Sequence, residues 1–286
     1  MKMLTFFLPV CLIGILPSPA LDTTRQTDPL SESLIAHYTF NHCDARDDTG
    51  NGNDGILFGD PGCHCGVEDD ALLLDGVDDY IEFHGPVNRY FTTSDFTVSF
   101  YFKPGKQSVF RQSMLGKRPA CDEYTMFDLQ LDMTRRDVNT AVYESPEKFF
   151  KDLSPDMDKT EWLHFALVME GRKATTYING SPRPGAWKCS GVDISNESVL
   201  SFANSPCLSS GRTVRFKGAL DELRIYGRAL HEAEIGQLYT LHPVEQAESD
   251  CITFVPEILP GQRPPEDIQS NYICAVLSQI TNPSFH

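Results

Sequence analysis

The amino-acid sequence predicts an all-β fold, a two-sheet antiparallel jelly-roll sandwich with one short C-terminal helix and a disulfide-tied tail. Between residues 34 and 241, short runs rich in Val, Ile, Phe, Tyr and Thr are separated by Gly, Pro, Asn and Asp, and helical periodicity is scarce. Residues 96–102 alternate strictly, as a strand with one buried face requires. One face carries Phe96, Val98, Phe100 and Phe102, and the other carries Thr97, Ser99 and Tyr101.

The other predicted strands are also β-branched and aromatic runs bounded by turn residues. In chain order, the predicted strands are residues 35–40, 71–74, 79–83, 96–102, 125–131, 162–170, 173–178 and 220–226. Residues 162–178 form a hairpin, because Glu170, Gly171 and Arg172 supply a short turn between two apolar runs. Roughly 200 residues of such strands suit a single jelly roll rather than an immunoglobulin-size unit.

A helix is predicted at residues 230–241, directly after the last strand. Acidic residues lie near its positive amino end, and its apolar face consists of Leu230, Ile235 and Leu238. Beyond it, residues 242–286 are rich in proline and acidic residues and contain two cysteines. We interpret this part as an extension tied down by disulfides rather than as a second domain.

The amino terminus has the layout of a secretory signal peptide. Lys2 precedes an apolar run from Leu4 to Leu16, which is too short to span a bilayer, and a small-residue cleavage site ends at Ala20. We therefore predict a signal peptide at residues 1–20, a linker at 21–33 and a secreted, extracellular domain at 34–241. No second apolar run approaches the roughly 20 residues of a membrane helix, and an uncleaved anchor is the alternative.

Cysteine usage agrees with export. Of the 9 cysteines, Cys11 falls in the signal peptide, which leaves an even set. These disulfide candidates are Cys43, Cys63, Cys65, Cys121, Cys189, Cys207, Cys251 and Cys274. Proximity along the chain favours the pairs Cys189–Cys207 and Cys251–Cys274. Zinc at Cys63, His64 and Cys65 is the alternative, although the spacing is not that of a known zinc finger.

Charge narrows the class of partner. The chain has 24 basic and 40 acidic residues and a formal net charge of -16, which argues against nucleic acid because phosphates require a basic face. Cations or cationic surfaces are favoured, and an acidic excess also keeps a secreted protein soluble. A role in a mineralised or calcium-rich matrix is a further alternative.

Two acidic segments are candidates for a site. Asp221 and Glu222 interrupt a strand where the neighbouring Leu220, Leu223 and Ile225 indicate a half-buried backbone. A carboxylate at such a position needs a partner or a cation. The second segment, residues 47–55, is rich in Asp, Asn and Gly and has the composition of a tight loop.

The order of these motifs resembles the laminin G-like branch of the concanavalin A-like jelly rolls, the group that also includes pentraxins. The matching segments are residues 34–40, 48–55, 71–81, 96–100, 162–168, 176–180 and 216–230. The resemblance implies that the first and last core strands are neighbours, so that the loop at Asp48 meets Asp221. It thereby implies a Ca²⁺ site whose ligands are Asp48, Asn51, Asn53 and Asp221. The alternative is a tight turn that Asp221 closes by hydrogen bonds.

The sequence favours a protein that is not an enzyme. Related glucanases carry acidic residues at alternating strand positions, and no such Glu-x-Asp-x-Glu pattern occurs here. Asp128 and Asp132 come nearest, and we interpret them as a solvated face. No serine-hydrolase or zinc-protease motif is present either.

We therefore predict a secreted, non-catalytic binding module that recognises a glycan or an extracellular protein and holds a structural calcium ion. A structural protein of an extracellular or biomineral matrix and a divergent glycan hydrolase are the alternatives. Asn196 lies in an N-glycosylation motif, and Asn179 lies in a poorer one because Pro182 follows it. Trp162 begins a strong strand and is expected in the core.

Overall fold

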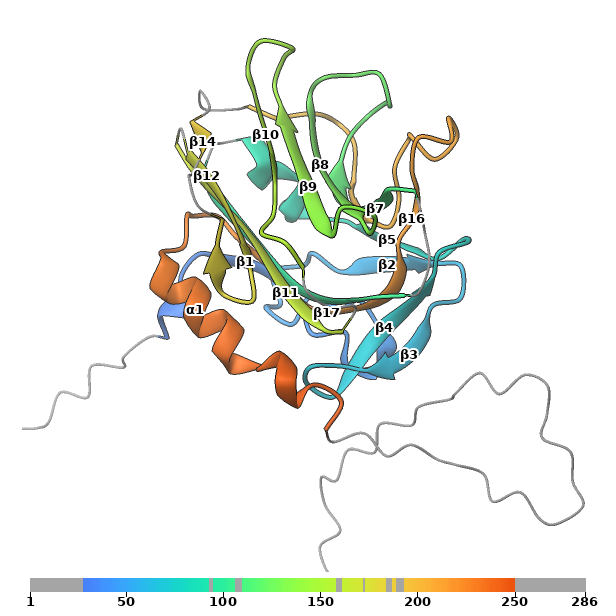
Figure 1. Cartoon of the computed structure of the whole chain (residues 1–286), viewed down its shortest axis with the longest axis vertical. Helices are drawn as coiled ribbons and strands as arrows, with labels where there is room; N and C mark the ends of the chain where they lie inside the picture. The colour runs from blue at the N-terminus through green and yellow to red at the C-terminus, as the bar shows by residue number, and fades with distance from the viewer. Residues whose placement is uncertain are drawn as a thin grey trace, which may run out of the picture.

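The computed structural model describes residues 28–92, 95–105, 110–157, 161–171, 173–183, 187–188 and 193–249. They form two β-sheets that pack face to face, with a helix beside one of them (Figure 1). Sheet A runs in the order β13-β12-β11-β6-β17-β4-β3, with β1 paired to β17 and β14 paired to β12. Its strands are β1 (Leu34–Tyr38), β3 (Gly62–Cys65), β4 (Asp70–Asp75), β6 (Phe96–Pro104), β11 (Leu163–Glu170), β12 (Lys173–Ile178), β13 (Ser181–Pro182), β14 (Trp187–Lys188) and β17 (Lys217–Tyr226).

Sheet B runs in the order β10-β9-β8-β7-β15-β5-β2, and β16 pairs with β7. All pairs in both sheets are antiparallel except that of β16 with β7. The strands of sheet B are β2 (Gly55–Phe58), β5 (Tyr80–Phe83), β7 (Gln112–Lys117), β8 (Met126–Asp132), β9 (Asp137–Tyr143), β10 (Phe149–Leu153), β15 (Leu200–Phe202) and β16 (Val214–Arg215). The all-β sandwich that the sequence predicts is therefore confirmed.

The helices are short. The predicted C-terminal helix is α1 (Glu232–Leu241), whose Ile235 and Leu238 are buried as expected. The 3-10 helices are η1 (Pro29–Ser31), η2 (Asn41–Cys43), η3 (Pro86–Thr92) and η4 (Val244–Gln246). Within the described ranges, none of the helices has the length and apolar character that a bilayer crossing requires.

The main core lies between the two sheets, and β6 shows how the strands reach it. Phe96, Val98, Phe100 and Phe102 all belong to this core, as their alternation predicts. The opposite face of β6 is buried as well. Its Tyr101 lies under α1 and donates a hydrogen bond to the carbonyl of Leu238 in that helix at 2.9 Å. Sheet A is therefore covered on both faces. Trp162 is buried on this second face and not in the main core.

Two disulfides are described, Cys43–Cys63 and Cys121–Cys207. The predicted pair Cys189–Cys207 is wrong, because the fold brings Cys207 to within 4.8 Å (Cα to Cα) of a cysteine 86 residues away. Cys65 is disulfide-bonded as well, which excludes the zinc alternative at residues 63–65. Cys189, Cys251 and Cys274 lie outside the described residues.

Candidate functional site

The glycine-rich loop is organised by Asp47, a residue that the sequence analysis did not select. Its Oδ1 accepts hydrogen bonds from the backbone N–H groups of His37 and Thr49 and from the Thr49 hydroxyl. Its Oδ2 accepts from the backbone N–H and the side-chain amide of Asn53. These five donors saturate the carboxylate, so that the chain itself holds the loop shut. Gly50 and Gly52 have positive φ values of 73° and 80°, which the turn requires.

The four predicted calcium ligands have separate partners. Asn53 donates to the Ile35 carbonyl and to Asp47, and its Oδ1 accepts from the Val87 N–H at 2.6 Å. Its own carbonyl accepts the Tyr38 hydroxyl at 2.6 Å, so both of its oxygens have a donor within the chain. The Asn51 amide donates to the Ile35 carbonyl at 3.0 Å.

Asp48 and Asp221 lie on different sides of β1. Asp48 Oδ2 accepts the Thr39 hydroxyl at 2.7 Å, whereas Asp221 Oδ2 accepts the Val67 N–H at 2.7 Å. Both backbone groups of His37 face the loop: its N–H donates to Asp47 and its carbonyl accepts from Asp48. β17 pairs with the opposite edge of β1, which confirms that the first and last core strands are neighbours. Asp48 and Asp221 thus each have a partner within the chain, and calcium stays an untested prediction.

A bulge in β17 places Asp221 and Glu222 together on the outer face of sheet A. Asp221 is opposite Tyr101 and Arg224 is opposite Ser99, so one extra residue is inserted between them. Glu222 adopts a positive φ of 51° at this point. Without the extra residue, a regular alternation would send one of the two carboxylates into the core between the sheets. Leu220, Leu223 and Ile225 do belong to that core.

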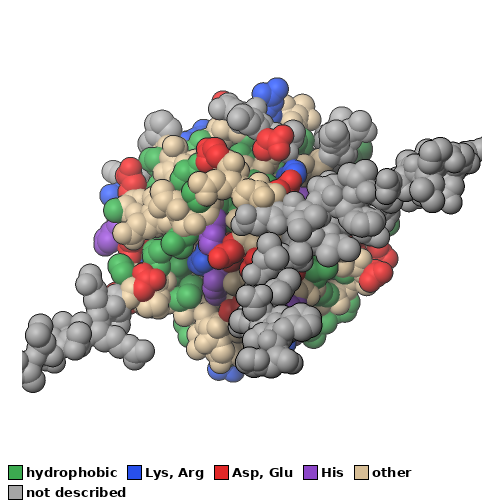
Figure 2. Space-filling view, turned by 90° about the horizontal axis from the view of Figure 1, so that it is seen from below, with side chains coloured by type: hydrophobic (Ala, Val, Ile, Leu, Met, Phe, Trp, Pro, Cys, Tyr) green, Lys and Arg blue, Asp and Glu red, His purple; other side chains and the backbone are tan. Residues whose placement is uncertain are grey.

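Glu222 lies among basic side chains supplied by this chain. Its Oε2 contacts the Arg224 guanidinium, and it is 2.9 Å from His37 Nε2 and 3.6 Å from His242 Nε2. Burial opposes its ionisation, yet the His37 hydrogen bond and the Arg224 charge keep the pKa of Glu222 below its usual value. Figure 2 shows histidine, acidic and basic side chains close together on the face seen from below.

Asp221 has the opposite character. It is fully buried, and burial together with the neighbouring Glu222 charge raises its pKa well above the ordinary value. Its Oδ1 has no hydrogen-bond partner among the described residues. Burial and the Glu222 charge therefore both favour the protonated form of Asp221.

A serine–histidine pair on the same face does not form a catalytic dyad. Ser99 Oγ is 2.7 Å from His164 Nε2, but both side chains are buried between sheet A and α1. Burial lowers the pKa of His164 to about 3. A substrate has no access to this hydroxyl, and we assign the pair a structural role.

The outer face of sheet B carries a polar row across four strands. Glu82, Ser201, Gly116 and Asp128 are successive cross-strand neighbours on β5, β15, β7 and β8. They line a pocket of about 320 Å³ together with Arg118, Ser198, Val199, Asn204, Ser205 and Pro206. Carboxylate, guanidinium, hydroxyl and amide groups are therefore presented together, which supplies both donors and acceptors to a ligand.

Aromatic pairs flank this row on both sides. Phe58 and Tyr80 stack at a centroid distance of 4.4 Å on β2 and β5, and Tyr143 and Phe149 stack at 4.7 Å on β9 and β10. Tyr80 shares the outward register of Glu82, and Tyr143 shares that of Ala141, which is opposite Asp128. Phe149 remains 43% exposed and offers its ring to a ligand.

The interpretation of Asp128 and Asp132 as a solvated face is wrong, because both are buried. Asp128 pairs with Arg118 at 3.1 Å and accepts from the Gln130 amide at 2.8 Å. Burial raises its pKa although Arg118 acts in the opposite direction. Asp132 pairs with Arg111 at 3.4 Å. The arginines neutralise these carboxylates, which the sequence spacing alone does not show.

The distance between carboxylates on sheet B bears on whether the pocket could hydrolyse a glycoside. Glu82 and Asp128 are three strands apart, about 14 Å between backbones, whereas glycoside hydrolysis requires carboxyl groups about 5 to 9.5 Å apart. Asp132 and Asp137 are direct cross-strand neighbours, whose Cβ atoms lie about 4.5–5.5 Å apart. Both are buried and bound to arginines, and neither lines the pocket on sheet B. Among the described residues, the carboxylates of this pocket do not form a hydrolytic pair.

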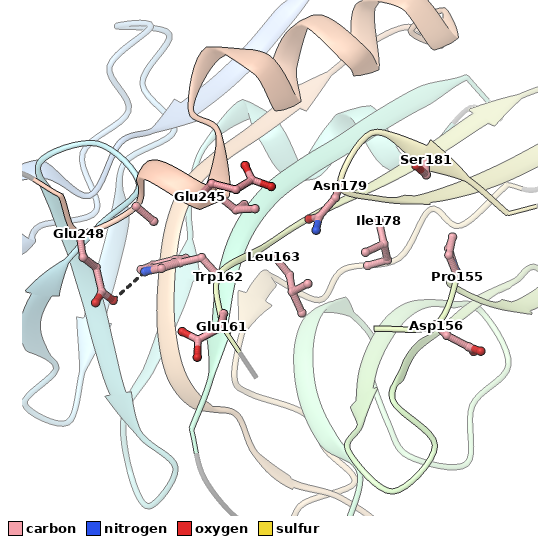
Figure 3. A pocket seen from close by; sticks show the side chains of 12 residues that line it. Pro155, Asp156, Glu161, Trp162, Leu163, Ile178, Asn179, Ser181, Glu245 and Glu248 are labelled. Atoms are coloured by element: carbon pink, nitrogen blue, oxygen red, sulfur yellow. Dashed lines mark hydrogen bonds between the residues drawn. The ribbon is translucent and has the colours of Figure 1, made fainter. Parts of the chain in front are cut away.

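A second pocket, of about 570 Å³, lies at the edge of sheet A beside η4 (Figure 3). Leu163 and Ile178 form its apolar part, and its carboxylates are Asp156, Glu161, Glu245 and Glu248. Trp162 also lines it, but the indole is almost fully buried and donates to Glu248 at 2.8 Å. This tryptophan is therefore not available to stack on a sugar ring.

The two glycosylation motifs differ in access. Asn196 is partly buried, and its amide donates to the carbonyls of Thr125 and Ile194 while its Oδ1 accepts from the Lys117 ammonium. A glycan on this amide would displace those bonds. Asn179 uses its Oδ1 to accept the His164 N–H at 2.9 Å and lines the edge pocket. The geometry thus favours Asn179, the motif with the poorer sequence.

Comparison with known families supports the fold. The family model described as the concanavalin A-like lectin/glucanases superfamily matches residues 75–236, more than half of the 286 residues. A comparison with curated proteins gives no match.

Solved structures with a similar fold include several binding domains. One of these structures is domain 4 of AbnA, a GH43 extracellular arabinanase from Geobacillus stearothermophilus, in complex with arabinotriose. Its sequence is 22% identical to this chain and its TM-score is 0.58; the match covers 72% of this chain and 98% of that chain. The binding domain of Paraclostridial mosquitocidal protein 1 is 17% identical, with a TM-score of 0.57, and the match covers 72% of this chain and 52% of that chain. The binding domain of botulinum neurotoxin DC in complex with SialylT is 12% identical, with a TM-score of 0.56, and the match covers 73% of this chain and 52% of that chain. This chain spans about half of each toxin domain, and such identities show the fold alone.

Proposed function

Because the chain belongs to the concanavalin A-like lectin/glucanases superfamily, we propose that it is a non-catalytic module that binds a glycan on the outer face of sheet B. The observation that carries this proposal is the pocket lined by Glu82, Ser201, Asn204, Arg118 and Asp128. Sugar hydroxyls both donate and accept hydrogen bonds, and this pocket offers partners for both. The arabinotriose complex of the arabinanase domain is consistent with such a ligand class on this fold.

Glu82 is a carboxylate of this pocket with spare hydrogen-bonding capacity. Its side chain is 26% exposed, and its described ion-pair partner is His84 at 3.5 Å, which is itself at the surface. Asp128, in contrast, is occupied by Arg118 and Gln130. We therefore expect Glu82 to accept hydrogen bonds directly from the ligand.

A glycan array followed by calorimetry on the best glycan tests the proposal. Glu82→Gln should weaken binding about 10- to 100-fold, because a charged hydrogen bond contributes about 1.5–3 kcal/mol. Glu245→Gln, the same change at the edge pocket, is the matched control and should leave affinity unchanged. Loss of affinity in Glu245→Gln alone would move the site to the edge pocket, and the absence of any glycan binding by the wild type would refute the proposal.

Secretion, calcium and the choice between a glycan and an extracellular protein are further parts of the proposal. Repeating the array with EDTA separates a calcium-dependent lectin from a calcium-independent one. The hydrolase alternative predicts new reducing ends when the bound glycan is incubated with the protein. Their loss in Asp137→Asn would assign that activity to the pair with Asp132, the carboxylates with suitable spacing.

A further inference from the structure

Two loops border the sheet B pocket, and a disulfide joins them. Residues 118–125 connect β7 to β8, and residues 203–213 connect β15 to β16. Cys121 of the first loop is bonded to Cys207 of the second. The pocket is lined by Arg118 from the first loop and by Asn204, Ser205 and Pro206 from the second. The disulfide therefore ties together two walls of the same pocket.

On the first loop, the position of Arg118 depends on the backbone beside the disulfide. Its Nε donates to the Ala120 carbonyl at 2.9 Å, and its Nη2 donates to the carbonyl of Cys121. The remaining Nη1 donates to Asp128 Oδ2 at 3.1 Å in the floor of the pocket. Two of the three bonds that orient this guanidinium thus end at or next to Cys121.

On the second loop, Cys207 holds the short turn that forms the opposite wall. Its N–H donates to the Ser205 hydroxyl at 3.2 Å, and its carbonyl accepts the Ser210 hydroxyl at 2.8 Å. Arg212 and Asp122 form another bridge between the loops at 2.7 Å. That pair is largely exposed, so it is a weak substitute for a covalent link.

The disulfide does not belong to the core between the sheets. Neither Cys121 nor Cys207 is part of that core, whereas Cys43 of the other described disulfide packs against it. Loss of the Cys121–Cys207 bond should therefore release the two loops without dissolving the sandwich. The covalent link acts on the pocket more than on the fold.

We propose that Cys121–Cys207 is a positioning element of the ligand site: it holds Arg118 on Asp128 and keeps Ser205 and Pro206 at the rim before ligand arrives. The proposal rests on the proposed function, because it assigns a role in the same pocket. Preorganisation lowers the ordering cost of binding. The double substitution Cys121→Ser/Cys207→Ser should therefore weaken glycan binding about tenfold, mostly through faster dissociation.

The matched control is Cys43→Ser/Cys63→Ser, which removes a disulfide on the sheet A side of the molecule. We expect both double variants to melt at lower temperature, but only the Cys121/Cys207 variant to lose affinity for the glycan found with the wild type. Arg118→Lys, which keeps the disulfide, should lose affinity as well because it cannot make the three bonds. Equal affinity in the Cys121/Cys207 variant, or equal losses in both double variants, would overturn the proposal.

Amide hydrogen exchange gives a readout that needs no ligand. Exchange in residues 118–130 and 203–213 should become faster in the Cys121/Cys207 variant and stay unchanged in the Cys43/Cys63 variant. Unchanged exchange in both segments would refute the positioning role even if the wild type binds no glycan. Failure of the wild type to bind any glycan, with the expected exchange pattern, would instead refute the proposed function alone.

Discussion

The cationic surroundings of Glu222 lead to a quantitative prediction about stability. The carboxylate is 1% exposed and contacts Arg224, which is itself buried. Arg224→Met removes the charge that compensates Glu222 most directly, and breaking a buried pair from one side costs about 3–5 kcal/mol. For a domain of this size each kcal/mol lowers Tm by about 2–4 °C, so we expect a loss of about 6–20 °C.

Removing the Glu222 charge should also lower the free energy of unfolding, but the losses caused by the two substitutions should not add. Glu222→Gln leaves the Arg224 guanidinium buried without its carboxylate, whereas the double variant Glu222→Gln/Arg224→Met removes both charges. We therefore expect the double variant to be more stable than either single variant. Arg46→Met, at an exposed pair with Asp44, is the control and should cause no measurable loss.

Urea denaturation of the wild type and the four variants measures the free energies of unfolding and closes the double-mutant cycle. Single variants at Glu222 and Arg224 that lose less than about 1 kcal/mol would show that the pair is not held as a buried ion pair. A double variant as unstable as the sum of the two single losses would show that they act independently. Either result would refute this explanation of the bulge.

Three further predictions concern protonation and metal. The raised pKa of Asp221 means that its contribution to stability is fully present below pH 3.8 and is lost as the pH rises through the folded pKa. Asp221→Asn should therefore gain stability relative to wild type in urea titrations as the pH rises above 3.8. A pH-independent difference between the two proteins would contradict this. The pKa of His164 is lowered to about 3, so the stability that the neutral imidazole contributes is present above the unfolded pKa of 6.5 and is lost as the pH falls below it. His164→Gln should therefore reduce the fall of Tm with falling pH in thermal melts. An unchanged dependence of Tm on pH would contradict this. The proposed calcium ion predicts that EDTA speeds amide exchange at Thr49 and Asn53 in the loop. Unchanged exchange would show that Asp47, with its donors from the chain, holds the loop without a metal.

Much of the fold follows from local sequence pattern. The alternation in β6, the β11–β12 hairpin and the apolar face of α1 are each visible in one short segment, and all are confirmed. The strands that are not predicted are β2, β3, β7, β9, β10 and the short strands β13 to β16. β7 carries a register shift between Ser113 and Gly116, which breaks the period of two, and β10 is a five-residue edge strand with charged residues inside it.

The candidate sites are harder to predict because their members meet only in the folded sheet. Glu82, Gly116, Asp128 and Ser201 lie on four strands, and no spacing along the chain joins them. The same holds for Cys121 and Cys207, 86 residues apart. The role of Asp47 in holding the loop is a local feature that the sequence also carries. The hydroxyl of Thr49, two residues after Asp47, is the signal of an Asx-type turn that identifies it.

The most direct test of the account is to map the bound glycan on the protein by hydrogen exchange. A glycan bound on the outer face of sheet B should slow exchange in residues 114–118, 126–130 and 200–206 and leave exchange at residues 244–248 unchanged. Protection confined to residues 244–248 and 161–163 would place the ligand in the edge pocket and contradict the assignment to sheet B.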